Sequence, residues 1–256
     1  MRIARIAAEG YERGGDDYER ARPSYPPRAV ALLVEELGIG PGRTVLDLAA
    51  GTGKLTRLLR PTGATLVAVE PVAAMRRHLE SVPDVQVVAG TAEAIPCADA
   101  SIDAVAVATA FHWFRGDQAL AEISRVLKPG GGLGLVWNNP DQALDWVAEI
   151  WGLVDAKRRG APRNRDLSWQ AAFASAPGFT PLQHESFFHS QRLGIDDLIA
   201  RVNSIAFVAS LRPAEREDLL ARVREIVGSH PDVAAGDELR LPYRTDVYWC
   251  RKTPRG

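Results

Sequence analysis

The sequence predicts an α/β protein with a parallel sheet that carries helices on both faces. Short apolar runs alternate with segments of helical periodicity, which is the pattern of strands joined by helices. We expect the strands at 44–48, 66–70, 85–89, 103–109 and 132–138. A glycine-rich turn follows the first strand and opens a helix. Ligands of such sheets bind at the carboxyl ends of the strands, so we expect a site beside this turn.

Further elements flank this alternation. The spacing of apolar residues predicts a helix that stops at Gly38, before the turn formed by residues 40–42. The expected elements are this helix at 27–37, helices carrying Trp146, Trp151 and Trp169 within 141–176, a strand at 181–193, two helices at 196–228 separated at Pro213, and a last strand at 238–250. A chain of 256 residues without repeats or a low-complexity linker predicts one domain.

The segment TVLDLAAGTGKLT, residues 44–56, is the most informative motif. Its glycines at 51 and 53 let backbone N–H groups approach a ligand closely. Leu55, Leu58 and Leu59 lie on one helical face that can pack on the sheet. The next strand ends at Glu70, where this kind of fold places a carboxylate that accepts hydrogen bonds from ribose hydroxyls. The ligand is therefore expected to contain a ribose.

Two other glycine loops fit this segment poorly. A dinucleotide fingerprint read from Gly51 places Thr56 where a small residue should pack helix on strand. A P-loop needs Ser or Thr after Gly53-Lys54 and a glycine at 48, whereas both positions are leucine. A ligand with adenosine and no phosphates is the better match.

Four blocks of sequence in this order resemble the class I S-adenosylmethionine-dependent methyltransferases of the type 11, small-molecule group. The blocks are VLDLAAGTG at 45–53, Val-Glu-Pro at 69–71 followed by Met75, GTAEAIP at 90–96 and EISRVLKPGG at 122–131. The resemblance covers residues 43–138. It implies a Rossmann-like, doubly wound sheet of seven strands whose last strand is antiparallel, together with a helical lid.

The resemblance also implies which residues bind the cofactor, S-adenosyl-L-methionine. They are Asp47, Ala49, Gly51, Gly53, Glu70, Pro71, Met75, Thr91, Ala92, Glu93, Thr109 and Phe111, with Tyr18 and Arg22 at the methionine end. Two positions depart from the family pattern. Ala49 replaces a glycine, which is a mild change if the backbone there avoids positive φ. Thr91 replaces an aspartate that often contacts the adenine, which leaves Ala92 and Glu93 as adenine-side partners.

The residues 110–114 (AFHWF) and 18–26 resemble a subgroup that includes trans-aconitate-type O-methyltransferases. The resemblance divides the single domain into an N-terminal cap at 1–40, a cofactor-binding core at 41–140, and substrate-side helices, lid and final strands at 141–256. Methyl transfer depends on holding the acceptor near the methyl group in a dry pocket. We expect residues 1–40 and 196–228 to form the lid of that pocket, or the N-terminal segment to pack on the sheet.

Substrate contacts are expected from Tyr25, His112, Trp113, Trp137 and Asn138. His112 is the candidate catalytic residue: its imidazole can act as a general base, position the acceptor, or only pack. The segment at 138–140 can also be a simple turn.

A carboxylate acceptor would need no base. In that case, arginines that clamp the carboxylate would matter more. Arg192, Arg240 and Arg244 are the candidates for such a clamp, with isolated surface arginines as the alternative.

The expected reaction is methylation of a small molecule, at the oxygen of a hydroxyl or carboxylate. The alternatives are a cofactor-binding protein that catalyses a reaction such as cyclisation, and a non-catalytic binding protein. The net charge of −1, from 31 basic and 32 acidic residues, argues against a nucleic acid partner. The two cysteines, the absence of a leader and the absence of a long apolar run predict a cytoplasmic protein without membrane contact. The histidines have no short paired ligand spacing, so no metal is expected.

Overall fold

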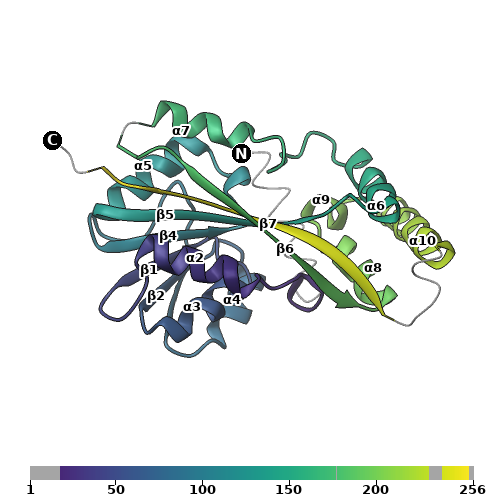
Figure 1. Ribbon diagram of the computed structural model, residues 1–256, viewed down its shortest axis with the longest axis horizontal. Coiled ribbons are helices and arrows are strands. Elements are labelled where there is room, and N and C mark those ends of the chain that lie inside the picture. The colour runs from purple at the N-terminus through teal and green to yellow at the C-terminus, as the bar shows by residue number, and fades with distance from the viewer. Residues whose placement is uncertain (1–17, 177, 231–237, 254–256) are drawn as a thin grey trace. The chain divides into compact units, whose positions relative to one another are not determined.

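The computed structural model describes residues 18–176, 178–230 and 238–253. Its strands form one seven-stranded sheet in the order β3-β2-β1-β4-β5-β7-β6 (Figure 1). The strands are β1 (Thr44–Leu48), β2 (Thr65–Val69), β3 (Val85–Val88), β4 (Ile102–Ala108), β5 (Leu127–Pro140), β6 (Gln183–Leu193) and β7 (Leu239–Arg251). The chain order reverses between β1 and β4, which is the place where this kind of sheet binds ligands.

Strands β3, β2, β1, β4 and β5 are parallel. The predicted bounds of the first four strands agree with the structure to within one residue. Strand β5 begins at Leu127 instead of the predicted 132, although residues 128–131 have the composition of a turn. The N–H of Gly130 donates to the carbonyl of Lys252, directly after β7, at 3.1 Å. Pairing with a neighbouring strand therefore overrides the local preference of the glycines.

Strand β7 runs antiparallel to both of its neighbours. Lys252, directly after β7, pairs with Gly130 and Gly131 near the start of β5, whereas Asp141, directly after β5, pairs with Pro242 near the start of β7. On the other side, an antiparallel bridge joins Phe179 to Lys252. This confirms the Rossmann-like class with an antiparallel last strand.

The helices are α2 (Pro27–Leu37), α3 (Lys54–Leu59), α4 (Ala73–Glu80), α5 (Gly116–Val126), α6 (Asp145–Ala156), α7 (Ala171–Ser175), α8 (Ile195–Asn203), α9 (Ala206–Ala209) and α10 (Pro213–Ser229), with the 3-10 turns η1 (Arg60–Thr62), η2 (Phe111–Trp113) and η3 (Ser168–Gln170). The helix at 27–37 has the bounds that the sequence predicts. The segment 196–228 contains three helices where two were predicted, because α8 ends at Asn203 and the short α9 follows. No helix within the described ranges is long and apolar enough to cross a bilayer.

Alternate residues of each central strand face two hydrophobic cores. Leu46, Val105 and Leu135 face a core to which α5 contributes Leu120 and Ile123. Their neighbours along the same strands face the opposite core. Val45, Ala104 and Val136 pack there with Leu33 of α2 and Leu55 of α3. Figure 1 shows α2 and α3 on one side of β1 and β4, and α5 and α7 on the other. The predicted doubly wound arrangement is confirmed.

The chain divides into two compact units, and the division falls within β5, β6 and β7. Of the described residues, unit 1 contains 18–23, 138–161, 188–230 and 238–244; unit 2 contains 24–137, 162–176, 178–187 and 245–253. In unit 1, α10 packs against α6 and α8. Residues 18–23 belong to unit 1, but α2 packs in a core of unit 2, so the proposed N-terminal cap at 1–40 is divided between the units.

Candidate active site

The turn after β1 is built on two glycines with left-handed backbone. Gly51 has φ 59° and Gly53, the N-cap of α3, has φ 88°. A Cβ at Gly53 would lie 2.6 Å from Cδ2 of Leu79, whereas a Cβ at Gly51 would meet no atom within 4 Å. Gly53 is therefore required by packing. Gly51 borders open space, where a ligand can approach the backbone closely.

Ala49 also has a left-handed backbone, with φ 56°. The expectation that alanine is a mild change rested on a backbone without positive φ, and the structure contradicts that condition. A left-handed backbone costs a residue with a Cβ about 1–2 kcal/mol. This strain lies directly between the strand and the glycine turn, and backbone strain of this kind collects at functional sites.

Glu70 holds the turn from the end of β2. Its Oε2 accepts the N–H of Gly51 at 2.9 Å, and its Oε1 accepts the N–H of Val72 at 2.9 Å. The side chain is only 5% exposed, and burial raises its pKa although both N–H groups favour the ionised form. Each carboxylate oxygen retains a lone pair. The carboxylate is thus fixed in place with capacity for the two hydroxyls of a ribose.

Asp47 lies beneath the same turn with acceptor capacity to spare. Its Oδ2 accepts the hydroxyl of Thr56 at 2.5 Å, while its Oδ1 is buried with no partner in the described structure. Burial raises the pKa of Asp47 to about 7. The hydroxyl of Thr52 is likewise buried and unpartnered. Buried polar atoms without partners are rare and call for an explanation. A ligand with amino and hydroxyl groups, such as S-adenosylmethionine, would supply these partners.

The other residues implied for the cofactor lie around this corner with mixed exposure. Pro71 and Thr91 are exposed, whereas Met75 and Ala92 are buried. The carboxylate of Glu93 accepts the backbone N–H of Arg115 at 2.9 Å. Glu93 therefore joins the loop after β3 to the loop before α5, so part of its acceptor capacity already has a structural use.

The end of β4 carries a second strained residue. Thr109 has φ 56°, and a positive φ is an outlier for a β-branched residue. Its N–H donates to the carbonyl of Val136 at 2.7 Å, and its hydroxyl lies 3.0 Å from the hydroxyl of Tyr25 at the start of α2. Because β1 pairs with β4, these groups lie at the same sheet edge as the glycine corner. Tyr25 thus contacts the end of β4, and its role in substrate binding stays a prediction.

His112 follows in η2 and is held by Trp137 at the carboxyl-end part of β5. The indole N–H of Trp137 donates to Nδ1 of His112 at 3.2 Å. An indole nitrogen can only donate, so Nδ1 must be the accepting nitrogen of a neutral ring and Nε2 must carry the proton. The only basic lone pair of the imidazole is then occupied. This geometry favours a hydrogen-bond donor at Nε2 over a general base.

An aromatic cluster fixes the His112 loop from below. The ring of Phe111 lies 5.4 Å from that of Phe114 and 5.9 Å from that of Trp169, and Trp169 lies 4.8 Å from Trp137. Phe111 is only 1% exposed. Its side chain serves the core, which leaves its backbone as the part that can face a cofactor. Trp113 is half-buried, and its ring lies 5.3 Å from that of His112.

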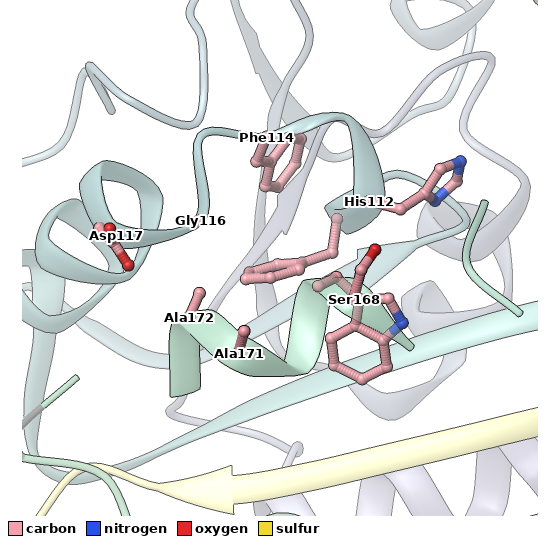
Figure 2. A pocket seen from close by; sticks show the side chains of 9 residues that line it. His112, Phe114, Gly116, Asp117, Ser168, Ala171 and Ala172 are labelled. Atoms are coloured by element: carbon pink, nitrogen blue, oxygen red, sulfur yellow. The ribbon is translucent and has the colours of Figure 1, made fainter. Parts of the chain in front are cut away.

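A pocket of about 410 Å³ opens beside this loop in unit 2. Its lining residues are Phe111, His112, Phe114, Gly116, Asp117, Ser168, Trp169, Ala171 and Ala172. In Figure 2 the imidazole of His112 points away from Ala171, Ala172 and Asp117. The sequence did not reveal this pocket, because the η3 and α7 residues that form one wall carry no motif. Only Trp169 had been noted, as a helical residue.

The remaining predicted residues lie in unit 1. The guanidinium of Arg22 stacks on Tyr18, 4.8 Å from the ring centroid, and Asn138 lies 3.4 Å from Nε2 of His189. The roles of Tyr18, Arg22 and Asn138 in binding stay predictions. Of the three candidate clamp arginines, Arg192, Arg240 and Arg244, all are exposed or nearly so, and Arg192 pairs with Glu238. Arg201 on α8 is buried in this unit, and the sequence analysis missed it because one arginine in an amphipathic helix gives no signal.

Comparison with known proteins bears on this geometry. Residues 46–135 match the family model described as a methyltransferase domain. The chain is 36% identical over 240 residues to an uncharacterized methyltransferase-like protein of Schizosaccharomyces pombe, covering 93% of both chains. It is 40% identical over 229 residues to an uncharacterized methyltransferase of Mycobacterium tuberculosis, covering 89% of both. The matched region contains the glycine corner, Glu70 and His112.

Solved structures show the same fold. A protein from Anaeromyxobacter dehalogenans assigned as a type II methyltransferase is 23% identical, with a TM-score of 0.67, covering 91% of this chain and 99% of its own. A Haemonchus contortus phosphoethanolamine N-methyltransferase, solved with S-adenosylhomocysteine, is 16% identical, with a TM-score of 0.55, covering 95% of this chain and 58% of its own. A cyclase also shares the fold, at 19% identity and a TM-score of 0.52, over 92% of this chain and 85% of its own.

Proposed function

Since this chain belongs to the class I S-adenosylmethionine-dependent methyltransferases, we propose that it methylates a small molecule at the oxygen of a hydroxyl or carboxylate. The family fixes the cofactor and the reaction type. The acceptor class is our inference. It is supported by a balanced charge, which gives no general attraction to a polyanion such as a nucleic acid.

The cofactor supplies a methyl group on a positively charged sulfur, open to displacement by an acceptor oxygen. Glu70 would hold the ribose hydroxyls with its two preorganised oxygens, and Asp47 with Thr52 would face the remaining polar groups. Gly51 would allow the backbone to come close. These residues bind and orient, and the gain in rate comes from that orientation.

The observation that carries the proposal is the arrangement at the end of β4. Thr109 and His112 follow the strand next to the glycine corner, and Tyr25 and Trp137 fix them by hydrogen bonds of 3.0 and 3.2 Å. We infer that Nε2–H of His112 donates to the acceptor oxygen and orients it. A carboxylate needs no deprotonation, since it is already ionised at neutral pH. A donor instead of a base at this position is therefore compatible with carboxylate methylation.

The test is an acceptor screen with the purified protein and S-adenosylmethionine. A panel of hydroxylated and carboxylic compounds is incubated with the protein, and S-adenosylhomocysteine is quantified. Mass spectrometry and hydrolysis in mild base then separate methyl esters from methyl ethers. Formation of S-adenosylhomocysteine together with an O-methylated acceptor, either ester or ether, supports the proposal if it depends on the acceptor. A methylated nitrogen or carbon would contradict oxygen as the target. An isomerised acceptor without S-adenosylhomocysteine would contradict methyl transfer and favour the cyclisation alternative.

A further inference from the structure

Unit 1 contains a buried arginine that no acidic side chain among the described residues neutralises. Arg201 on α8 is 3% exposed. Its Nε donates to the hydroxyl of Tyr243 at 3.1 Å, and its guanidinium lies 5.9 Å from the ring centroid of Trp151. Its Nη1 is buried and has no hydrogen-bond partner among the described residues. A neutral hydroxyl and an aromatic face are thus its surroundings.

The positive charge of Arg22 makes the position of Arg201 less favourable. Arg22 donates from Nε to the hydroxyl of Ser204 at 3.0 Å and from Nη2 to its carbonyl at 3.2 Å, while that hydroxyl donates to the carbonyl of Arg201 at 2.7 Å. Ser204 thereby holds Arg22 close to Arg201. Burial lowers the pKa of Arg201, and the positive charge of Arg22 lowers it further. Within the described ranges, no carboxylate offsets the two charges.

An arrangement of this kind does not serve stability. A buried charge without a partner costs several kcal/mol, and a hydrophobic side chain of similar volume often stabilises a protein more. Arginine is suited to planar oxyanions, because its fork donates two parallel N–H groups to a carboxylate. The free Nη1 of Arg201 and the adjacent Arg22 supply this chemistry, so the charge is explained if an anionic ligand completes the site.

The residues around Arg201 indicate a ligand whose carboxylate is attached to an apolar or aromatic group. The ring of His189 stacks on Tyr243 at 5.4 Å and 17°, and burial lowers the pKa of His189, which favours its neutral form. His189 contacts Asn138, which the sequence analysis named as a substrate residue. Trp151 covers another side of the guanidinium. Apart from Arg22, the side chains named here around the charge are aromatic or neutral.

We propose that Arg201, assisted by Arg22, binds a carboxylate group of the methyl acceptor. This inference rests on the proposed function and specifies its substrate as a carboxylic acid. The source of the carboxylate is assigned to the acceptor because Arg201 lies outside residues 46–135, which match the shared methyltransferase domain. The methionine carboxylate of the cofactor is the competing source. Position alone does not separate the two sources, because Arg22 also lies outside this domain and was expected at the methionine end of the cofactor.

The first experiment titrates benzoate and succinate, with benzamide and succinamide as neutral controls, into protein saturated with S-adenosylhomocysteine. Binding is followed by the side-chain N–H NMR signal of Arg201, assigned from its loss in Arg201→Gln. We expect the acids and not the amides to shift this signal. In Arg201→Gln the Kd of the acids should rise ~30-fold or more, as expected when a buried charge pair loses one partner. No shift with either acid overturns the proposal.

Two variants serve as controls for this measurement. Arg222→Gln removes an exposed arginine of α10 in the same unit and should leave acid binding unchanged. Arg201→Lys keeps the positive charge but cannot donate two parallel N–H groups to a carboxylate. Its affinity for the acids should therefore lie between those of Arg201→Gln and the wild type. An equal loss in Arg222→Gln would mean that the acids respond to general surface charge, which contradicts the proposal.

The second experiment measures the Kd of S-adenosylhomocysteine for the wild type and Arg201→Gln. Unchanged affinity, within ~3-fold, supports assignment to the acceptor. A rise of ~30-fold or more, equal to that for the acids, would show that Arg201 holds the cofactor carboxylate and would overturn the proposal. If the wild type binds no S-adenosylhomocysteine at all, it is the proposed function that fails. Circular dichroism of the variant excludes misfolding as the cause of lost binding.

Discussion

Glu70 links the glycine corner to its ligand, and its removal should affect both. The Glu70→Ala variant deprives Gly51 and Val72 of the acceptor for their N–H groups, so the free energy of unfolding should fall by ~1–3 kcal/mol. The Kd of S-adenosylhomocysteine, measured by calorimetry, should rise ~10–100-fold, because a charged acceptor of the ribose hydroxyls is lost. Glu80→Ala, an exposed change on α4, is the control. Unchanged affinity in Glu70→Ala would refute the assignment of the corner.

Asp47 should make the stability of the protein depend on pH. The pKa of this group is 3.8 in its ordinary state and about 7 in the folded protein. Between these values the unfolded chain has lost the proton while the folded protein keeps it. Raising the pH through this window therefore lowers the free energy of unfolding, by up to about 1.4 kcal/mol per pH unit.

The variant Asp47→Asn imitates the protonated side chain and removes this dependence. Urea unfolding at pH 5, 6, 7 and 8 should show the variant gaining stability relative to the wild type up to pH about 7, and a constant difference above it. Parallel profiles for the two proteins would contradict the raised pKa.

The role of His112 can be resolved with two isosteric substitutions. Gln places a donor near the position of Nε2, whereas Asn retains only an acceptor near Nδ1 for Trp137. If Nε2–H orients the acceptor, His112→Gln should keep most of kcat and His112→Asn should lose ~10–100-fold, with cofactor affinity unchanged in both. Equal losses in both variants, together with the disappearance of the acid limb of the pH–rate profile, would identify a base instead.

At the scale of elements, glycines in β5 let α2 approach the sheet. A Cβ at Gly134 would lie 2.3 Å from Cδ1 of Leu33 and 2.9 Å from Cδ1 of Leu37. Gly134→Ala should therefore lower the free energy of unfolding by ~1–3 kcal/mol, because α2 must move outward. Gly152→Ala in α6, where a Cβ meets no atom within 4 Å, should raise it by ~0.5–1 kcal/mol. Chemical denaturation measures both. A neutral Gly134→Ala would show that α2 is not tightly packed.

Elements whose pattern is local could be predicted from the sequence. The helix at 27–37 has its apolar spacing and its Gly38 stop within its own residues, and β1 to β4 are short apolar runs bounded by turns. The start of β5 could not be predicted, because residues 128–131 extend only through pairing with β7. The break between α8 and α9 was missed for a similar reason: residues 196–209 show continuous helical spacing, and the interruption comes at Ser204, whose side chain bonds to Arg201 and Arg22.

The candidate site was predictable to the extent that it is formed by contiguous motifs. Asp47, Gly51, Gly53 and Glu70 lie in two short segments, and the structure brings them together at one sheet edge. Contacts between distant segments were not predictable. The bond from Trp137 to His112, on which we base a donor role for His112, joins residues 25 positions apart, and Arg201 belongs to no motif.

At the scale of the whole molecule, the two units carry different parts of the chemistry. The methyltransferase domain match, residues 46–135, and the glycine corner fall in unit 2. Arg22, Asn138 and Arg201 belong to unit 1. We propose that the glycine corner of unit 2 binds the cofactor and that Arg201 of unit 1 binds a carboxylate of the acceptor. On this account, Arg201→Gln should raise the KM of the acceptor with little effect on the Kd of S-adenosylhomocysteine, and changes at the glycine corner should do the reverse.

The central claim is that the corner of unit 2 binds S-adenosylmethionine. A thermal-shift titration with S-adenosylmethionine and S-adenosylhomocysteine, with NAD and ATP as controls, tests it most directly. At a ~100-fold excess over the Kd, binding should stabilise the protein by ~2.7 kcal/mol, which raises Tm by roughly 5–10 °C for a chain of this size. The account predicts this shift with the two sulfur nucleosides alone. No shift, or a shift with NAD or ATP instead, would contradict it.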